Sequence, residues 1–99
     1  MAIQLLCINK LDGAFANPHE AICNFGWVND VTGNKGYSSK AEIVGFLEND
    51  HEVYIKRRGK VLYCSLRRNQ FGVPFIQAHI EGKYTNDLLS LKACQTSCR

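Results

Sequence analysis

Two neighbouring side chains, His19 and Glu20, are the pair in this sequence best suited to chemistry. An imidazole beside a carboxylate can act as a general base or as a pair of metal ligands. Consecutive residues of an extended chain point to opposite faces, however, so these two would not share one proton or one metal ion. We therefore predict a structural role, in which Pro18 fixes the entry of the segment and His19 bonds loop backbone or packs near Trp27.

Five cysteines raise the question of nucleophilic and metal chemistry; they are Cys7, Cys23, Cys64, Cys94 and Cys98. Cys23 and Cys64 fall in β-rich runs without the surroundings of a catalytic thiol, which favours buried, inert side chains. Cys94 and Cys98 have no second pair at metal-ligand spacing, so no zinc site is expected. An odd number of irregularly spaced cysteines, without a basic export signal at the N-terminus, predicts reduced thiols in the cytosol.

The sequence contains no phosphate-binding loop, no dinucleotide-binding glycine pattern and no zinc-protease motif. No serine or cysteine is accompanied by a recognisable base and orienting acid. We therefore expect a protein that is not an enzyme and that needs neither a cofactor nor a metal ion. No apolar run is long enough to span a membrane, and the expected location is the cytoplasm.

Charge is distributed unevenly along the chain. The 99 residues carry a net charge of +3, but residues 53–80 contain six basic residues and no acidic one. Because this segment carries +6, the remaining residues sum to −3. A surface of one sign attracts partners of the opposite sign. We therefore predict a partner-binding site formed by Lys56, Arg57, Arg58, Lys60, Arg67 and Arg68.

The elements that must position these residues follow from hydrophobic patterning and turn signals. Strands are expected at residues 3–8, 21–28, 53–56, 61–66 and 75–80. Ser39 and Glu42 form a capping box that begins a helix running to about Glu48, with Ile43, Phe46 and Leu47 on its apolar side. Residues 85–91 should form a short helical turn that three leucines pin to the core.

This order predicts an α+β fold, in which a small antiparallel sheet of β-β-α-β-β-β order carries one main helix and a short C-terminal helical turn. With 45% hydrophobic and 21% charged residues, the chain can close one modest core. We expect a single domain over residues 1–92, followed by a C-terminal tail over residues 93–99.

The basic residues should lie on a hairpin whose tip contains Arg58-Gly59, with Lys56 opposite residue 61. Arg67 and Arg68 would then lie at the far end, so the six charges need not form one patch. A solvated hairpin, whose charges prevent edge pairing, explains the same residues equally well. Trp27 and Tyr54 are secondary candidates for a binding surface together with His19, although a core position is favoured for Trp27. Tyr37, Tyr54 and Tyr63 stay open between core and surface, since alternate strand residues must face out and two tyrosines on neighbouring strands could form one exposed aromatic pair.

The chain resembles, over nearly its whole length, a small bacterial family known as a domain of unknown function. The resemblance is carried by residues 8–10, 17–22, 26–28, 32–33, 38–39, 53–55 and 82–91. Asn86-Asp87 reverses the order typical of the family, and His79 replaces a threonine or tyrosine. Relatives include proteins proposed as anti-CRISPR inhibitors of Cas9-type nucleases, and the resemblance therefore implies an inhibitor. It supplies no catalytic site.

Three functions follow as hypotheses. The first is a non-enzymatic inhibitor from a phage or mobile element, an anti-CRISPR that binds a type II Cas9 effector or its complex with guide RNA. The second is direct nucleic-acid binding by the basic residues, with an affinity that falls steeply as salt rises. The third is sequestration of a small ligand by an oligomer, in pockets between subunits near Trp27 and His19.

Overall fold

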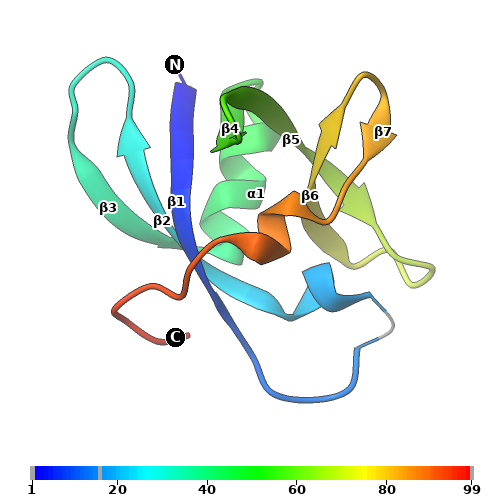
Figure 1. The fold of residues 1–99 in the computed structure, drawn as a ribbon. Helices are drawn as coiled ribbons and strands as arrows, with labels where there is room; N and C mark the ends of the chain where they lie inside the picture. Colours follow the sequence, from blue (N-terminus) through cyan, green and yellow to red (C-terminus); the bar gives the residue numbers. More distant parts are fainter. Residues whose placement is uncertain (1, 16, 99) are drawn as a thin grey trace.

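A computed structural model describes residues 2–15 and 17–98, so the outer limits of the predicted domain and tail, residues 1 and 99, lie outside it. Seven strands form one sheet in the order β3-β2-β1-β4-β5-β6-β7 (Figure 1). The elements are β1 (Ala2–Lys10), η1 (Pro18–Ala21), β2 (Ile22–Asn29), β3 (Lys35–Ser39), α1 (Lys40–Glu48), β4 (Glu52–Arg57), β5 (Lys60–Arg68), β6 (Pro74–Ile80), β7 (Lys83–Tyr84) and η2 (Asp87–Ser90), where η1 and η2 are 3-10 turns.

The predicted α+β class, with one helix on a sheet and a C-terminal helical turn, is confirmed. The sheet is mixed, however, because β4 runs parallel to β1 while the other neighbours are antiparallel. The cause is the α1 crossover, which carries the chain from β3 at one edge back to the side of β1. Two strands, β3 and β7, were not predicted as separate elements. Gly36 explains why β3 was not predicted, because a glycine in a sequence is typical of a loop. In the structure this glycine leaves room for the Trp27 ring, since a Cβ at position 36 would come within 2.7 Å of that ring.

The helix begins where the capping box predicts. The Ser39 hydroxyl accepts a hydrogen bond from the Glu42 N–H at 3.2 Å, and the Glu42 carboxylate accepts one from the Ser39 N–H at 2.9 Å. Ile43 and Val44 are buried against the sheet, with Phe46 and Leu47 packed beside them. The predicted apolar stripe is therefore correct, with Val44 added to it.

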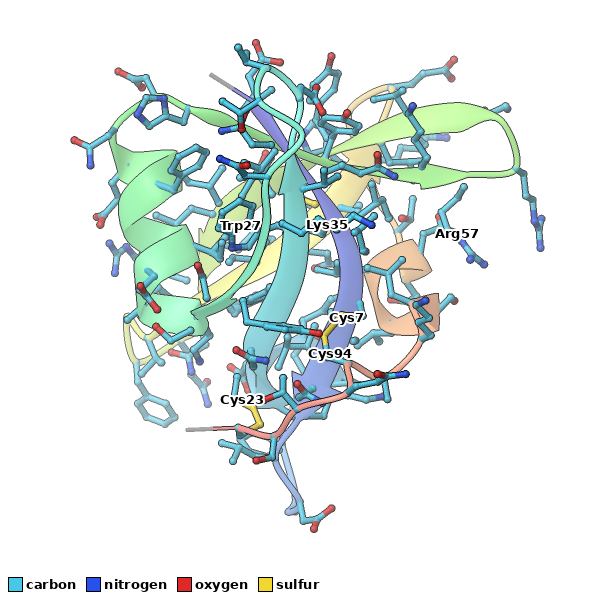
Figure 2. The ribbon with its side chains drawn as sticks, turned by 90° about the vertical axis from the view of Figure 1, so that its left-hand side faces the viewer. Cys7, Cys23, Trp27, Lys35, Arg57 and Cys94 are labelled. Atoms are coloured by element: carbon cyan, nitrogen blue, oxygen red, sulfur yellow. A yellow bond between two sulfur atoms is a disulfide. The ribbon has the colours of Figure 1, made fainter. Side chains whose placement is uncertain are left out.

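The core lies between α1 and the sheet. Alternate residues of the central strands enter it, including Ile55, Leu62, Cys64, Ile76 and Ala78. Cys64 is buried as predicted, and burial raises the pKa of its thiol to about 12, which disfavours the reactive thiolate. Trp27 packs against the core on the helix side, and its indole N–H donates a hydrogen bond to the Ser38 hydroxyl (Figure 2). No helix among the described residues is long and apolar enough to cross a bilayer.

The other four cysteines form two disulfides, Cys7–Cys94 and Cys23–Cys98, so the prediction of reduced thiols is wrong for them. The paired residues lie 87 and 75 positions apart, and only the folded chain brings them together. Residues 92–98, most of them expected as a tail, run beside β1: the Ile8 N–H donates to the Lys92 carbonyl, and the Cys94 N–H donates to the Ile8 carbonyl. The cytoplasmic location rested partly on reduced thiols and remains a prediction.

A candidate binding face on strands β4 to β7

A row of four aromatic side chains crosses the sheet on the face that points away from α1. Each is the direct cross-strand partner of the next: Tyr54 on β4 pairs with Tyr63 on β5, Tyr63 with His79 on β6, and His79 with Tyr84 on β7. Their neighbours along the strands, such as Ile55 and Cys64, enter the core, and alternation therefore places the row on the opposite face. We call Tyr54, Tyr63, His79 and Tyr84 the aromatic row.

The rings of the aromatic row differ in how much surface they offer. Tyr54 is 8% exposed, and its hydroxyl donates a hydrogen bond of 2.6 Å to the Asp30 carboxylate. That hydrogen bond, followed by burial, raises the pKa of Tyr54 to about 12. Tyr63 and Tyr84 are each 47% exposed. Tyr54 therefore anchors one end of the row, while Tyr63 and Tyr84 present ring surface to a ligand.

Contacts between neighbours fix the geometry of the row. The ring centres of Tyr54 and Tyr63 lie 6.3 Å apart. Those of His79 and Tyr84 lie 5.9 Å apart, with the edge of one of these two rings against the face of the other. The His79 Nε2 lies 2.7 Å from the Ser65 hydroxyl, which holds the imidazole in place on the strand surface. The rings thus have a defined arrangement before any ligand arrives.

Arg67 is stacked on the same face. Its guanidinium carbon lies 4.1 Å from the centre of the Tyr84 ring and 5.5 Å from that of Phe75, its cross-strand partner. The guanidinium also donates a hydrogen bond of 2.8 Å to the Gln77 side-chain oxygen, and the Gln77 amide donates to the Thr85 carbonyl. Arg67 is therefore a positioned cation between the buried ring of Phe75 and the exposed ring of Tyr84.

The six predicted basic residues do not form one patch. Lys56 and Arg67 share the face of the aromatic row, since Lys56 follows Tyr54 by two residues on β4. Arg57 points from the hairpin towards η2, where its Nε lies 3.9 Å from the Asp87 carboxylate (Figure 2). Arg68, near the other end of β5, lies 3.7 Å from the Glu48 carboxylate. Lys60 and Arg58 are exposed at the hairpin tip.

The hairpin itself has the predicted register, with Lys56 opposite Val61. Arg58 and Gly59 both have positive φ, 54° and 77°, as a tight two-residue connection between twisted strands requires. A shallow hollow of about 210 Å³ lies beside the tip and is lined in part by Arg57, Lys60 and Asp87. The tip is therefore a second basic region, separate from Arg67.

His19 lies in η1 and is 1% exposed. Its ring Nδ1 lies 2.9 Å from the Asn17 side-chain oxygen, which also accepts the His19 backbone N–H, so its ring bonds a side chain rather than the predicted loop backbone. Burial, and then the positive charge of Arg67, lower the pKa of His19. The Glu20 carboxylate accepts hydrogen bonds from the Asn69 side chain and the Asn17 N–H. Both members of the pair thus hold the η1 turn in place.

No metal centre is assembled among the described residues, and the small-ligand pockets, expected between subunits, stay a prediction. Among residues 2–15 and 17–98, no three His, Cys, Asp or Glu side chains are grouped as metal ligands. Two hollows of about 220 and 240 Å³ are lined in part by Trp27, and His19 lines neither of them. Trp27 and His19 are therefore not brought together as one site.

The sequence predicted an exposed pair of tyrosines on neighbouring strands; Tyr54 and Tyr63 are such neighbours, but Tyr54 is buried. The other half of the row, His79 and Tyr84, was missed. A local signal was present. Glu81 and Gly82 form a two-residue turn in which both residues have positive φ. Such a turn places His79, two residues before it, opposite Tyr84, two residues after it. Arg67 was predicted as a charge, whereas its stacking on Tyr84 depends on the packing of three strands.

Comparison of the chain with models of protein families, with curated proteins and with solved structures gives no match. We therefore infer a function from the geometry of the aromatic row and the charges around it.

Proposed function

We propose that this chain is a non-enzymatic binding protein whose ligand is single-stranded nucleic acid, held across the aromatic row. The observation that carries the proposal is the cross-strand register of Tyr63, His79 and Tyr84, which lines up two exposed tyrosine rings with a half-buried imidazole between them on one sheet face. Every nucleobase has a π-face, and stacking of a base on an aromatic side chain contributes about 1–3 kcal/mol to binding. Such a row accepts successive bases with little sequence preference.

The charges around the row suit a phosphate backbone. Arg67 lies against Tyr84. Lys56 lies on the same sheet face as Tyr54, two residues closer to the basic hairpin tip. A strand whose bases stack on the rings would therefore carry its phosphates past cations on both sides of the row. A duplex hides the faces of its bases, so the proposal favours single strands over duplexes.

Fluorescence anisotropy with a labelled 12-nucleotide single strand, its duplex form and a salt series tests this function. We expect the single strand to bind more tightly than the duplex. We also expect the logarithm of the association constant to fall with the logarithm of salt concentration, with a slope of about −0.7 for each phosphate contact. Equal binding of both forms, or no binding in 50 mM salt, would contradict the proposal.

The second candidate is inhibition of an RNA-guided nuclease of the Cas9 type, which the family resemblance implies. The feature that favours it is the β4–β5 hairpin, which projects from the body of the protein and exposes Arg58 and Lys60 at its tip (Figure 2). Such a projection can reach an acidic protein surface or bound guide RNA. The test is target cleavage by Cas9 after incubation with excess protein, with Arg58→Glu/Lys60→Glu as the variant. Undiminished cleavage by Cas9 with the wild-type protein would exclude this candidate.

A further inference from the structure

A groove lies on the outer face of strands β1 to β3, at the far end of the sheet from the aromatic row, and a disulfide forms part of its wall. Cys7 of β1 and Cys94 of the C-terminal segment both line it, together with Tyr37 of β3. Figure 2 places Lys35 and the Cys7–Cys94 bond on the same side of the sheet. Cys7 and Cys94 are only 7% and 8% exposed, and the groove is the side on which this small exposed surface lies.

The backbone leaves room for this bond. A Cβ at Gly26, on the neighbouring strand β2, would collide with the Cys7 Sγ and would lie 3.3 Å from the Cys94 Sγ. It would also lie 3.2 Å from the Tyr37 ring. Only glycine at this position allows the sulfur pair and the Tyr37 ring to share the groove.

The charge of the groove has one sign. Lys35 enters from β3 and Lys92 from the C-terminal segment, and both are exposed lysines. None of the described residues that line the groove is acidic. A small anionic molecule that enters the groove is therefore attracted towards the disulfide.

We propose that Cys7–Cys94 is a thiol–disulfide exchange site for small anionic thiols. A thiolate of such a molecule attacks the Cys7 Sγ, which lines both halves of the groove. The Cys7–Cys94 bond breaks, a mixed disulfide forms at Cys7, and the electron pair leaves on Cys94 as a thiolate in the same groove as Lys92. A second thiolate attacks the mixed disulfide and releases the symmetric disulfide of the small thiol. Two small thiols are oxidised, and Cys7 and Cys94 are both reduced.

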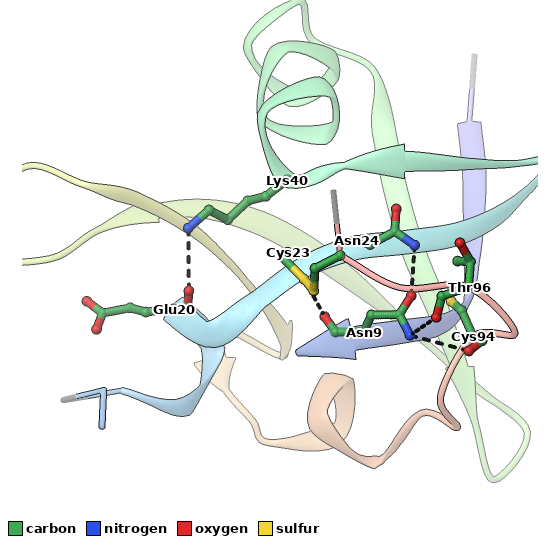
Figure 3. Close-up of a disulfide and its surroundings, with 8 residues drawn as sticks. Asn9, Glu20, Cys23, Asn24, Lys40, Cys94 and Thr96 are labelled. Carbon is green, nitrogen blue, oxygen red and sulfur yellow. Dashed lines mark hydrogen bonds between the residues drawn. A yellow bond between two sulfur atoms is a disulfide. The ribbon is translucent and has the colours of Figure 1, made fainter. Parts of the chain in front are cut away.

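The product keeps the C-terminal segment near β1. The Asn9 side chain donates hydrogen bonds to the Cys94 and Thr96 carbonyls, at 3.3 and 2.9 Å (Figure 3). The second disulfide, Cys23–Cys98, holds the end of the segment to β2. Exchange at Cys7–Cys94 therefore loosens the segment at its middle without releasing it.

The experiment treats the whole protein with reduced glutathione, which is anionic, with neutral 2-mercaptoethanol and with cationic cysteamine. Samples are alkylated at intervals, and each cysteine is followed by peptide mass spectrometry. Rates are compared at equal thiolate concentration. We expect a glutathione adduct at Cys7, formed about three to ten times faster than the cysteamine adduct at low salt, with 2-mercaptoethanol between them. Raising salt to 0.5 M should bring the three rates together.

The matched variants are Lys35→Gln/Lys92→Gln and the control Lys83→Gln on β7. The first should remove most of the preference for glutathione and leave the 2-mercaptoethanol rate unchanged, whereas the control should change neither rate. The proposal is overturned if Cys7 and Cys94 are already free thiols in the untreated protein or if no adduct forms at Cys7. It is also overturned if the rates depend neither on the charge of the thiol nor on the two lysines. Nucleic-acid binding is not involved in any of these readouts.

Discussion

The guanidinium of Arg67 lies 4.1 Å from the centre of the Tyr84 ring, so that a cation and an exposed aromatic surface form one unit at the end of the aromatic row. Gln77 holds the guanidinium from the side, and Phe75 lies beneath it. A guanidinium held in this way loses little further freedom when it meets a phosphate or a base. The proposed binding face is therefore organised before any ligand binds.

Replacing Tyr63 or Tyr84 by alanine should weaken binding of a single strand. Each change removes one exposed ring, and we expect a loss of about 1–3 kcal/mol of binding free energy, measured by fluorescence anisotropy. Tyr37→Ala is the matched control, because Tyr37 is 52% exposed but lies on β3, which three other strands separate from β5. If the control weakens binding as much as Tyr63→Ala, the aromatic row is not the site.

Arg67→Lys separates stacking from charge. Lysine keeps the positive charge but lacks the planar group that stacks on Tyr84 and bonds Gln77. We expect weaker binding with a nearly unchanged salt slope, whereas Lys56→Gln should make the slope shallower by about 0.7. The two slopes come from the same anisotropy titrations. A salt slope that falls for Arg67→Lys but stays constant for Lys56→Gln would contradict these assignments.

Acid should destabilise the fold through His19. Because the pKa of His19 is lowered in the folded state, the unfolded chain binds a proton more readily than the folded one. Stability is therefore complete above the ordinary pKa of about 6.5 and falls as the pH drops below it, by at most about 1.4 kcal/mol for each pH unit. Urea unfolding at pH 7.5, 6.0 and 5.0 measures this loss. His19→Gln should reduce the slope, and an unchanged slope would assign the effect to other groups.

The bond between Tyr54 and Asp30 should contribute modestly to stability. Tyr54→Phe removes the hydroxyl but keeps the ring in the row, and the exposed Asp30 carboxylate regains water. We expect a loss of about 1 kcal/mol in the free energy of unfolding, with little effect on ligand affinity. Denaturant titration measures the first and anisotropy the second. A loss of affinity as large as that of Tyr63→Ala would mean that the Tyr54 hydroxyl contacts the ligand.

Local signals in the sequence were sufficient for the helix start and for the basic hairpin. The capping box of Ser39 and Glu42, and the pairing of Lys56 with Val61, depend on residues at most five positions apart. The parallel pairing of β1 with β4 and the disulfides depend on segments that meet only after folding. A sequence pattern cannot reveal which distant cysteines will meet.

The candidate site was predicted only in part, again because some of its contacts form between segments that meet only after folding. Lys56, Arg67 and Tyr54 were named from the sequence, and the structure places all three on one face. The sequence suggested a site built from charge, whereas Arg57 and Arg68 lie close to carboxylates and point away from that face. The aromatic row emerges only from the register of four adjacent strands.

The most direct test of the account is an NMR titration of the isotope-labelled protein with an unlabelled 12-nucleotide single strand. The account predicts that the largest shift changes fall on the rings of Tyr63, His79 and Tyr84 and on the Arg67 side chain, with small changes in α1 and β3. It is contradicted if the spectrum does not change, or if the largest changes lie at the hairpin tip, in the groove beside Cys7 or on the helix.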